Sequence, residues 1–378
     1  MKILLPNTKG RMEAFALKTE PLIVRAPKTQ WNRTAFAAAH VVADPLSDDD
    51  IDWKGTLAYR QNLLKLGFNI AEAMDTSQRG MGLTWESAHE LIARSLQSAG
   101  PHSVRIYSGC GTDHLDPADA RNLDDVVRAY LEQITAIQKL GGRIILMASR
   151  ALVRVAKTPD DYLKVYTRVL NEADHPVILH WLGDMFDPAL KGYWGSDSFV
   201  MKMETCLAMI KTNAVKIDGI KISLLDADKE VAMRRALPTG VKMYTGDDFN
   251  YPELIAGDAH GYSHALLGIF DAIAPSASQA LSALALGKVD KFHALLAPTV
   301  PLSRLIFRSP TQNYKTGIVF LAWLNGYQDH FVMIAGAQSS RSLGYFVECF
   351  KLAEQTGLLR KPDLAVKRMK QLLALYGM

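Results

Sequence analysis

Short apolar runs alternate with longer stretches of helical period along most of the 378-residue chain. The runs with strand character are 35–42, 68–74, 103–107, 143–147, 176–180, 217–222, 241–244 and 261–265. Their starts lie roughly 20 to 41 residues apart, which leaves room for a crossover helix between parallel strands. Near-continuous apolar strands indicate burial on both faces. The pattern predicts an α/β protein with a (β/α)8 TIM barrel. The alternative is an open doubly wound sheet, but no GxGxxG follows the first strand.

Helices fill the gaps between these runs. The first ends at Gly67, a C-cap glycine, and Thr84 opens the second, over 88–98. A third helix is expected over 123–140, where apolar residues recur on one side. Thr158, followed by a proline, is expected to cap another.

The two ends of the chain differ from the middle. Residues 1–30 are expected to form a hairpin with strands near 3–5 and 14–17 that closes the bottom of the barrel. The barrel itself is expected over 31–275, and 276–378 form a helical extension packed on it. Helical stretches in that extension are 276–286, 290–296, 302–307, 317–324 and 340–355.

Composition excludes several classes of protein. Hydrophobic residues make up 48% of the chain and charged residues 22%, as in a globular protein with a large core. The net charge of +4 comes without a basic block, so no nucleic-acid partner is predicted. Three distant cysteines (Cys110, Cys206 and Cys349) argue against a disulfide framework or a structural zinc site. No apolar run approaches about 18 residues and no signal peptide is seen, so we expect no membrane association and a cytoplasmic location.

Polar residues gather where the predicted strands end. In a TIM barrel the carboxyl ends of the strands carry the chemistry. The polar or glycine positions predicted there are His40, Asp75, Thr76, Gly111, Thr112, Asp113, His180, Lys221, Gly246, Asp247, Asp248 and His264.

Lys221 lies between two isoleucines in a strand predicted to be buried on both sides. Burying an unpaired ammonium costs several kcal/mol, so the pKa of Lys221 is expected to fall. A neutral lysine attacks carbonyl carbon and forms a Schiff base. The alternative is a structural ion pair between Lys221 and Asp247 or Asp248.

Six segments occur in the order found in one known family. They are Ile51-Asp52-Trp53 with the helix after it, 108–113, 176–180, 218–221, 245–248 and 257–263. This order resembles that of the dihydrodipicolinate synthase/N-acetylneuraminate lyase superfamily of class I, Schiff-base aldolases, over roughly residues 35–310. The chain looks like a longer branch of that superfamily.

The resemblance implies that Lys221 forms an imine with a 2-keto acid or related ketone, and that Gly246 and the 109–112 loop line the substrate pocket. It also implies a homo-oligomer. His180 stands where the family has a proton-relaying tyrosine, and an imidazole can do the same acid–base work near neutral pH.

Two further departures concern the substrate. Asp75 and Thr76 stand where the family has paired hydroxyl residues that hold a carboxylate, and Asp75 would repel such a group. The arginine expected after the fifth strand is replaced by 183–185, Gly-Asp-Met. We therefore expect a polyhydroxylated, less anionic ligand, such as a keto sugar or a sugar-derived lactone.

These observations predict a Schiff-base-forming lyase, aldolase or dehydratase that acts on a keto group of a small carbohydrate-derived substrate and needs no cofactor. Lys221 is the nucleophile and His180 the general acid/base. The predicted substrate-binding residues are Asp75, Thr76, Gly111, Thr112, Asp113, Gly246, Asp247, Asp248 and His264.

Two other functions use the same barrel. A divalent metal could be held by His40, Asp75, His180, Asp247 and His264 in a sugar isomerase, epimerase or aldolase. Local support is thin, because the only HxxxH pair, His260 with His264, spans roughly 13 Å in extended chain. The third function is a non-catalytic ligand-binding barrel, which the many ionisable groups at the strand ends argue against.

Overall fold

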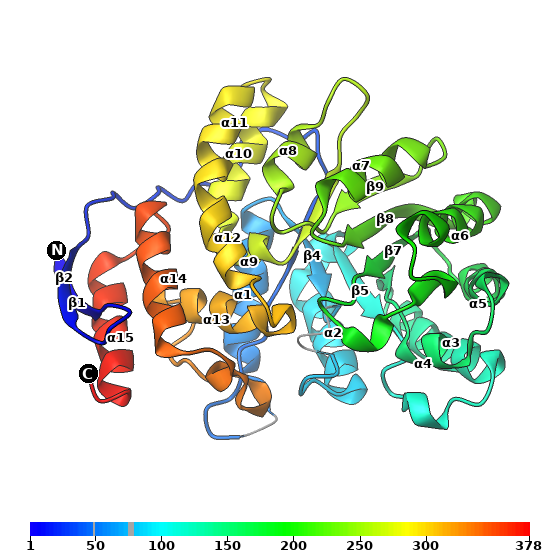
Figure 1. Cartoon of the computed structure of the whole chain (residues 1–378), viewed down its shortest axis with the longest axis horizontal. Coiled ribbons are helices and arrows are strands. Elements are labelled where there is room, and N and C mark those ends of the chain that lie inside the picture. Colours follow the sequence, from blue (N-terminus) through cyan, green and yellow to red (C-terminus); the bar gives the residue numbers. More distant parts are fainter. Residues whose placement is uncertain (48–49, 75–78) are drawn as a thin grey trace. The chain divides into compact units, whose positions relative to one another are not determined.

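The computed structural model describes residues 1–47, 50–74 and 79–378 (Figure 1). Contacts between residues divide the chain into two compact units. The first comprises 1–32, 40–68 and 268–378, and the second 33–39 and 69–267. This division differs from the three expected segments, because residues 40–68 cluster with the C-terminal helices.

The second unit contains a closed barrel of parallel strands. In order around the barrel, these are β3 (Ala35–Ala38), β4 (Asn69–Glu72), β5 (Ile106–Cys110), β6 (Arg143–Leu146), β7 (Val177–Leu182), β8 (Ile217–Ser223), β9 (Lys242–Thr245) and β10 (His264–Leu267). Strand β10 pairs with β3 and closes the ring. The predicted (β/α)8 barrel is confirmed.

Helices of the second unit follow the strands along the chain and lie outside them in Figure 1. They are α2 (Trp85–Ala99), α3 (Leu123–Lys139), α4 (Arg150–Val155), α5 (Pro159–Asn171), α6 (Phe199–Thr212), α7 (Ala227–Ala236) and α8 (Tyr251–Ala256), with short 3-10 helices η1 (Gly100–Arg105), η2 (Pro117–Asp119), η3 (Pro188–Leu190), η4 (Tyr193–Gly195) and η5 (Ala214–Lys216). The side chain of Thr84 caps α2, and Thr158 caps α5 in a capping box with Asp161, as the sequence predicts. Among the described residues, no helix is both long enough and apolar enough to cross a bilayer.

The first unit is mainly helical. Its strands are β1 (Lys2–Pro6) and β2 (Met12–Ala16), an antiparallel hairpin. Its helices are α1 (Trp53–Lys65), α9 (Ile269–Ala272), α10 (Ala274–Ala285), α11 (Val289–Leu296), η6 (Ala297–Thr299), α12 (Val300–Ile306), η7 (Thr311–Asn313), α13 (Tyr314–Leu324), η8 (Ile334–Ser340), α14 (Leu343–Gln355) and α15 (Pro362–Leu375). Helix α15 was not predicted.

The N-terminal hairpin packs against the C-terminal helices of the first unit. Strand β1 contacts α14, and the amides of Lys18 and Thr19 donate to Glu354 Oε1 at 2.6 and 2.7 Å. The hairpin itself is as predicted, and its closure of the bottom of the barrel stays a prediction. Its short apolar face is covered by helices from the other end of its own unit.

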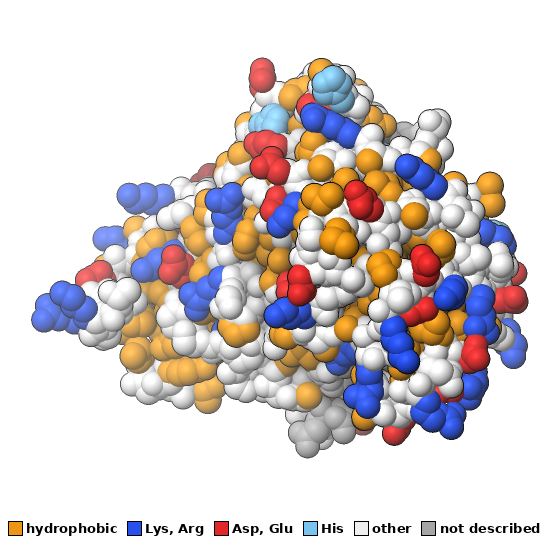
Figure 2. Space-filling model, turned by 45° about the vertical axis from the view of Figure 1, so that its right-hand side comes forward, with side chains coloured by type: hydrophobic (Ala, Val, Ile, Leu, Met, Phe, Trp, Pro, Cys, Tyr) orange, Lys and Arg blue, Asp and Glu red, His pale blue; other side chains and the backbone are white. Residues whose placement is uncertain are grey.

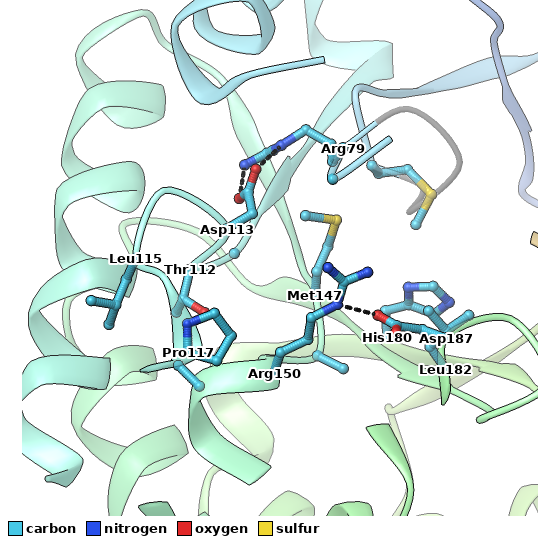
Figure 3. A pocket seen from close by; sticks show the side chains of 15 residues that line it. Arg79, Thr112, Asp113, Leu115, Pro117, Met147, Arg150, His180, Leu182 and Asp187 are labelled. Carbon is cyan, nitrogen blue, oxygen red and sulfur yellow. Dashed lines mark hydrogen bonds and ion pairs between the residues drawn. The ribbon is translucent and has the colours of Figure 1, made fainter. Parts of the chain in front are cut away.

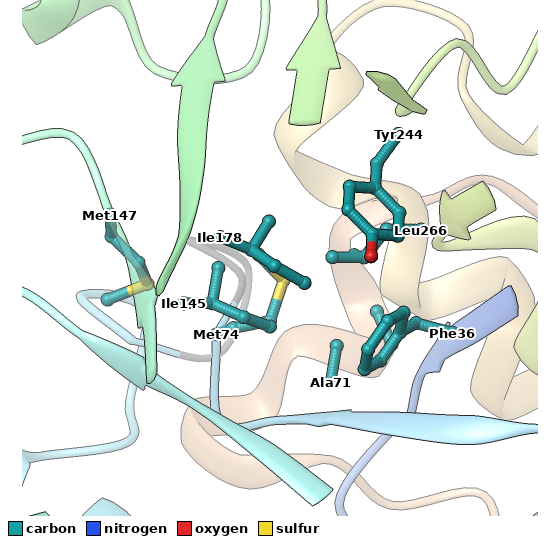
Figure 4. Packing of buried hydrophobic residues seen from close by; sticks show 9 residues of the cluster. Phe36, Ala71, Met74, Ile145, Met147, Ile178, Tyr244 and Leu266 are labelled. Carbon is teal, nitrogen blue, oxygen red and sulfur yellow. The ribbon is translucent and has the colours of Figure 1, made fainter. Parts of the chain in front are cut away.

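Apolar side chains fill the interior of the barrel (Figure 4). Phe36 on β3 makes edge-to-face contacts with Tyr107 on β5 and Tyr244 on β9, at ring centroid separations of 4.9 and 5.8 Å. Ile178 on β7 belongs to the same buried cluster. Because side chains alternate along a strand, His180, two residues further along β7, also points inward.

Two strands begin three residues later than predicted. Strand β5 starts at Ile106 because residues 100–105 form a 3-10 helix that a glycine and a proline open. Strand β10 starts at His264 because Asp258 and Gly261 close a turn, in which the Asp258 amide donates to the Gly261 carbonyl at 2.8 Å. Because of the second shift, His264 is the first residue of β10 and lies at the amino end of that strand.

Charged side chains of both signs share the face seen in Figure 2, where Lys and Arg are densest towards the lower right with Asp and Glu among them. On α3, Asp125 accepts from Arg121 and Arg128 at 3.1 and 2.7 Å. Asp124 pairs with Arg168 of α5 at 2.5 Å. Opposite charges therefore pair on and beside α3.

Glu230 of α7 is buried behind the barrel wall, with 1% of its surface exposed. Its carboxyl group accepts from Thr245 Oγ1 at 2.8 Å and from Ser263 Oγ at 2.7 Å. Loss of water raises the pKa of Glu230 to about 8, and these two hydrogen bonds oppose the rise only partly. At neutral pH the folded protein therefore holds a neutral Glu230.

We predict that the free energy of unfolding falls as pH rises from about 4.5 to about 8, because folded Glu230 keeps its proton over this range. In that window the unfolded chain releases the proton and the folded chain keeps it, so raising pH favours unfolding by a total of the order of a few kcal/mol. Glu230→Gln should remove this slope, whereas Glu204→Gln, at an exposed position of α6, should leave it unchanged. Urea unfolding between pH 5 and 9 measures both. Equal slopes in wild type and Glu230→Gln would contradict the prediction.

Candidate active site

A pocket opens in the second unit at the carboxyl ends of strands β4 to β7 (Figure 3). Its volume of about 630 Å³, open solvent included, suits a small molecule. The lining residues follow these four strands and are Met74, Arg79, Gly80, Gly111, Thr112, Asp113, Leu115, Pro117, Met147, Ala148, Arg150, Ala151, His180, Leu182 and Asp187.

Lys221 and His180 lie side by side inside the barrel. His180 on β7 is the register partner of Lys221 on β8, so both side chains emerge on the same face of adjacent strands. Both residues are buried, with 3% of His180 and 6% of Lys221 exposed. His180 Nε2 lies 3.2 Å from Ser223 Oγ, at the end of β8. A lysine and an imidazole therefore share one wall, and the imidazole also lines the pocket.

The environment of His180 keeps its imidazole neutral. Burial lowers the pKa of His180 well below its usual range, and the charge of Lys221 lowers it further. A neutral imidazole has one nitrogen that accepts and one that donates a proton. His180 can thus exchange protons with a group held beside it at neutral pH.

Gly246 gives the Lys221 side chain its space. A Cβ atom at Gly246 would lie 2.3 Å from Ser223 Oγ and 2.7 Å from Lys221 Cε. The Gly246 amide donates to the Ile222 carbonyl at 2.8 Å, which holds the loop after β9 against β8. A side chain at position 246 would therefore collide with the lysine and with the serine that contacts His180.

The loop after β5 brings Gly111, Thr112 and Asp113 to the pocket, as predicted for its position. Thr112 Oγ1 lies 2.7 Å from Ser149 Oγ. The Gly111 amide donates to Gln133 Oε1 at 2.7 Å. Of these groups, Thr112 and Gly111 line the pocket, and the Gly111 amide is already bonded within the protein.

Arg79 holds this loop in place and uses all of its side-chain hydrogen-bond donors to do so. Its guanidinium donates to both carboxylate oxygens of Asp113, to the carbonyls of Ala73 and Gly109, and to Gln133 Oε1. These five hydrogen bonds match its five donors. The charge of Arg79 also lowers the pKa of Asp113 against the opposing effect of burial. No local sequence pattern indicates this role of Arg79, because the role depends on contacts between separate loops.

Arg150 and Asp187 form a second ion pair in the pocket. Arg150 is the first residue of α4, which Ser149 caps, and its Nε donates to Asp187 Oδ2 at 2.7 Å. Asp187 is 5% exposed, whereas 40% of the Arg150 side chain is exposed. Neither residue was predicted. The position of Arg150 directly after the fourth barrel strand was the only signal that could have found it.

Asp247 and Asp248 are buried but do not line the pocket. Asp247 Oδ1 accepts from the amides of Phe249 and Asn250 at 2.8 and 3.0 Å, and Oδ2 accepts from Asn250 Nδ2 at 2.8 Å. Burial raises the pKa of Asp247. The Asp247 carboxylate thus shapes the loop after β9, and the structure does not bring it to the substrate pocket.

His264 lies at the opposite end of the barrel from the one expected. It is the first residue of β10, and its Nδ1 accepts from the Thr34 amide at 2.8 Å, just before β3. Burial lowers the pKa of His264 to about 4, helped by Lys242 and Arg33, which also stand at the amino ends of strands. The predicted placement of His264 among the site residues is therefore wrong.

The alternative metal site gains no support. His264 begins β10 and its Nδ1 accepts from the Thr34 amide. His40 belongs to the first unit, where its Nδ1 lies 3.0 Å from Asp271 and its Nε2 3.2 Å from Gln328. Across 1–47, 50–74 and 79–378, no three His, Cys, Asp or Glu side chains form a group that could hold a metal ion. Asp75 and Thr76 lie outside the described residues.

Comparison with solved structures defines the class of fold. The chain is similar to a chloride-inhibited dihydrodipicolinate synthase from Acinetobacter baumannii complexed with pyruvate, with 17% identity, a TM-score of 0.66, and 86% of this chain and 99% of that chain covered. It is also similar to dihydrodipicolinate synthase from Aquifex aeolicus (12% identity, TM-score 0.67) and to YagE, a prophage protein of that family from Escherichia coli K12 in complex with pyruvate (13%, 0.68), each covering 86% of this chain and 99% of the other. The fold is that of the dihydrodipicolinate synthase family.

The family model for a protein of unknown function, DUF993, matches residues 3–378. The chain belongs to this family. No curated protein matches it. The resemblance drawn from the sequence is thus confirmed at the level of fold.

We predict that Arg79→Met destabilises the protein by about 3 kcal/mol or more, because it leaves Asp113 and two loop carbonyls without their donor. The matched control is Arg94→Met, which removes an exposed pair with Glu90 on α2 and should cost less than about 1 kcal/mol. Urea unfolding measures both. Equal losses in the two variants would show that Arg79 does not organise the pocket.

Proposed function

We propose that this protein is a Schiff-base-forming lyase or aldolase that acts on a keto group of a small carbohydrate-derived substrate. The observation that carries the proposal is the register pairing, inside the barrel, of Lys221 with His180, which is the member of the pair that lines the pocket. A buried lysine beside a neutral proton carrier has the two groups that imine formation requires.

In the proposed reaction, the Lys221 amine adds to the keto carbon and gives a carbinolamine. Loss of water from this adduct gives the imine, and a proton must reach the departing hydroxyl. The His180 imidazole first accepts the proton that the Lys221 nitrogen releases and then passes it to the departing hydroxyl, which leaves as water. The same transfers run in reverse when water returns. The protonated imine then accepts the electron pair of the neighbouring carbon–carbon or carbon–oxygen bond as that bond breaks or forms.

The loop after β5 supports the role of a substrate cradle. Its Thr112 hydroxyl and the Ser149 hydroxyl face each other at 2.7 Å, and Arg79 with Gln133 holds the backbone from behind. Substrate hydroxyls would exchange hydrogen bonds with these groups. The proposal requires no cofactor. The cytoplasmic location and the homo-oligomeric state remain predictions.

Two of the similar structures contain pyruvate, a 2-keto acid, which makes pyruvate the first probe. We predict that borohydride traps pyruvate or a keto sugar acid as a stable amine on Lys221. Intact-protein and peptide mass spectrometry detect and locate this adduct. Lys221→Met should abolish it.

The matched control is Lys242→Met. Lys242 is on the neighbouring strand, and 39% of its side chain is exposed, so a merely accessible amine would react there first. This variant should keep the adduct. The proposal would be contradicted by an adduct on Lys242, or by the absence of any adduct with keto acids and keto sugars.

We predict that His180→Phe slows formation of the trapped adduct about a hundredfold or more, because it removes the imidazole that carries the proton. His180→Tyr should retain more of the rate, since a phenol also carries protons. The wild-type rate should fall in acid only below pH 6.5, because burial and Lys221 lower the pKa of His180. Quenched time courses between pH 5 and 8 measure these rates. Equal rates in the Phe and Tyr variants would refute a role in proton transfer.

A further inference from the structure

We propose that the first unit carries a second ligand site, which binds the carboxylate of a small organic acid through Arg360 and Asn325. A cavity of about 350 Å³, open solvent included, lies between the N-terminal segment and the helices of that unit. Its walls come from residues 22–24, from α1, α9 and α10, and from the segments 325–327 and 357–360, all of which belong to the first unit. None of its lining residues lines the pocket at strands β4 to β7.

The N-terminal segment is fixed at this cavity by contacts on two sides. The Leu22 amide donates to the Gly357 carbonyl at 2.8 Å, and the Ile23 carbonyl accepts from Gln279 Nε2 of α10 at 2.8 Å. Gly357 has a φ of +69°, and a Cβ atom there would lie 2.8 Å from a backbone oxygen of the N-terminal segment. A glycine is therefore required where the two segments meet, and the wall is ordered before a ligand binds.

Arg360 brings a guanidinium without a hydrogen-bonded partner to the cavity. Its Nε is buried and unbonded, and no described residue accepts a hydrogen bond from its terminal nitrogens. The Arg360 Cζ lies 4.6 Å from the centroid of the Tyr327 ring, which also lines the cavity. A buried donor without an acceptor costs about 1 to 3 kcal/mol, and an acceptor on a ligand would remove this cost.

Asn325 adds a second donor with a defined orientation. The residue is 5% exposed, and its Oδ1 accepts from the Arg360 amide at 2.8 Å. Because an amide N–H can donate only to the oxygen, the other side-chain atom is the nitrogen, Nδ2. No described residue accepts a hydrogen bond from Asn325 Nδ2, and Asn325 lines the cavity. Arg360 and Asn325 thus offer N–H groups to the same space.

The charges around the cavity favour a ligand with one negative charge. Asp271 also lines the cavity, but its carboxylate accepts from the His40 amide at 2.6 Å and lies 3.7 Å from Lys315 Nζ. Among the described lining residues, Arg360 is then the charged group without a counter-ion. One edge of a guanidinium matches the two oxygens of a carboxylate. A phosphate dianion would need a second cation, which these lining residues do not supply.

Most of the remaining lining is apolar. Leu22, Val24 and Pro275 line the cavity together with Tyr59 and Tyr327, whose ring centroids lie 5.2 Å apart. An apolar wall with a few polar groups is typical of a small-molecule site. The ligand class is therefore a monocarboxylic acid with a short apolar body, for which butyrate is the probe.

Ligand-observed NMR titration of the full chain with butyrate, n-butyramide and inorganic phosphate tests this site. Wild type should bind butyrate at least about tenfold more tightly than the amide, which keeps the shape and lacks the charge. Arg360→Met should weaken butyrate binding about tenfold to a hundredfold, and Arg360→Lys should weaken it less, because it keeps the charge and loses the fork. Lys361→Met is the matched control. Lys361 is exposed and does not line the cavity, so this variant should bind butyrate as wild type does.

A crystal structure of wild type soaked with butyrate locates the bound acid without any substitution. We expect its carboxylate within hydrogen-bonding distance of Arg360 and Asn325. Butyrate found only in the pocket at β4 to β7, or no binding of butyrate at all, would overturn the inference. Equal losses in Arg360→Met and Lys361→Met would also overturn it, and tighter binding of phosphate than of butyrate would overturn the assigned ligand class.

Discussion

The register in which β7 pairs with β8 fixes the positions of the two groups proposed to react. It puts His180 opposite Lys221, and the alternation of side chains turns both into an interior otherwise filled by apolar groups. Burial then keeps the imidazole neutral beside an amine. Gly246 leaves room for the Lys221 side chain, because a Cβ atom at this position would collide with both Lys221 and Ser223. A one-residue slip of either strand would separate the two groups.

Two arginines line the pocket beside this pair, and they make different contacts. Arg79 is buried and ties together the ends of β4 and β5, so the loop with Thr112 keeps one shape. Arg150 pairs with Asp187 through its Nε and also lines the cavity. Ion pairs that order the wall before a ligand arrives lower the cost of binding, because little has to be ordered at that moment.

The fold could be predicted because strand and helix periods run through the chain without interruption, and because burial of Lys221 follows from the isoleucines beside it. The position of His264 could not, since the turn at Asp258 and Gly261 moves the start of β10 and leaves the imidazole at the amino end. Arg150 was missed for another reason. Its role comes from an aspartate 37 residues away, and no local motif encodes such a contact.

A crystal structure of the protein soaked with pyruvate would show whether Lys221 forms an imine. We expect continuous electron density from Nζ of Lys221 to the keto carbon, with the imidazole of His180 within hydrogen-bonding distance of the adduct. Pyruvate bound in the pocket with the lysine amine unattached and turned away from it would rule out the proposed imine, whatever the fold of the barrel.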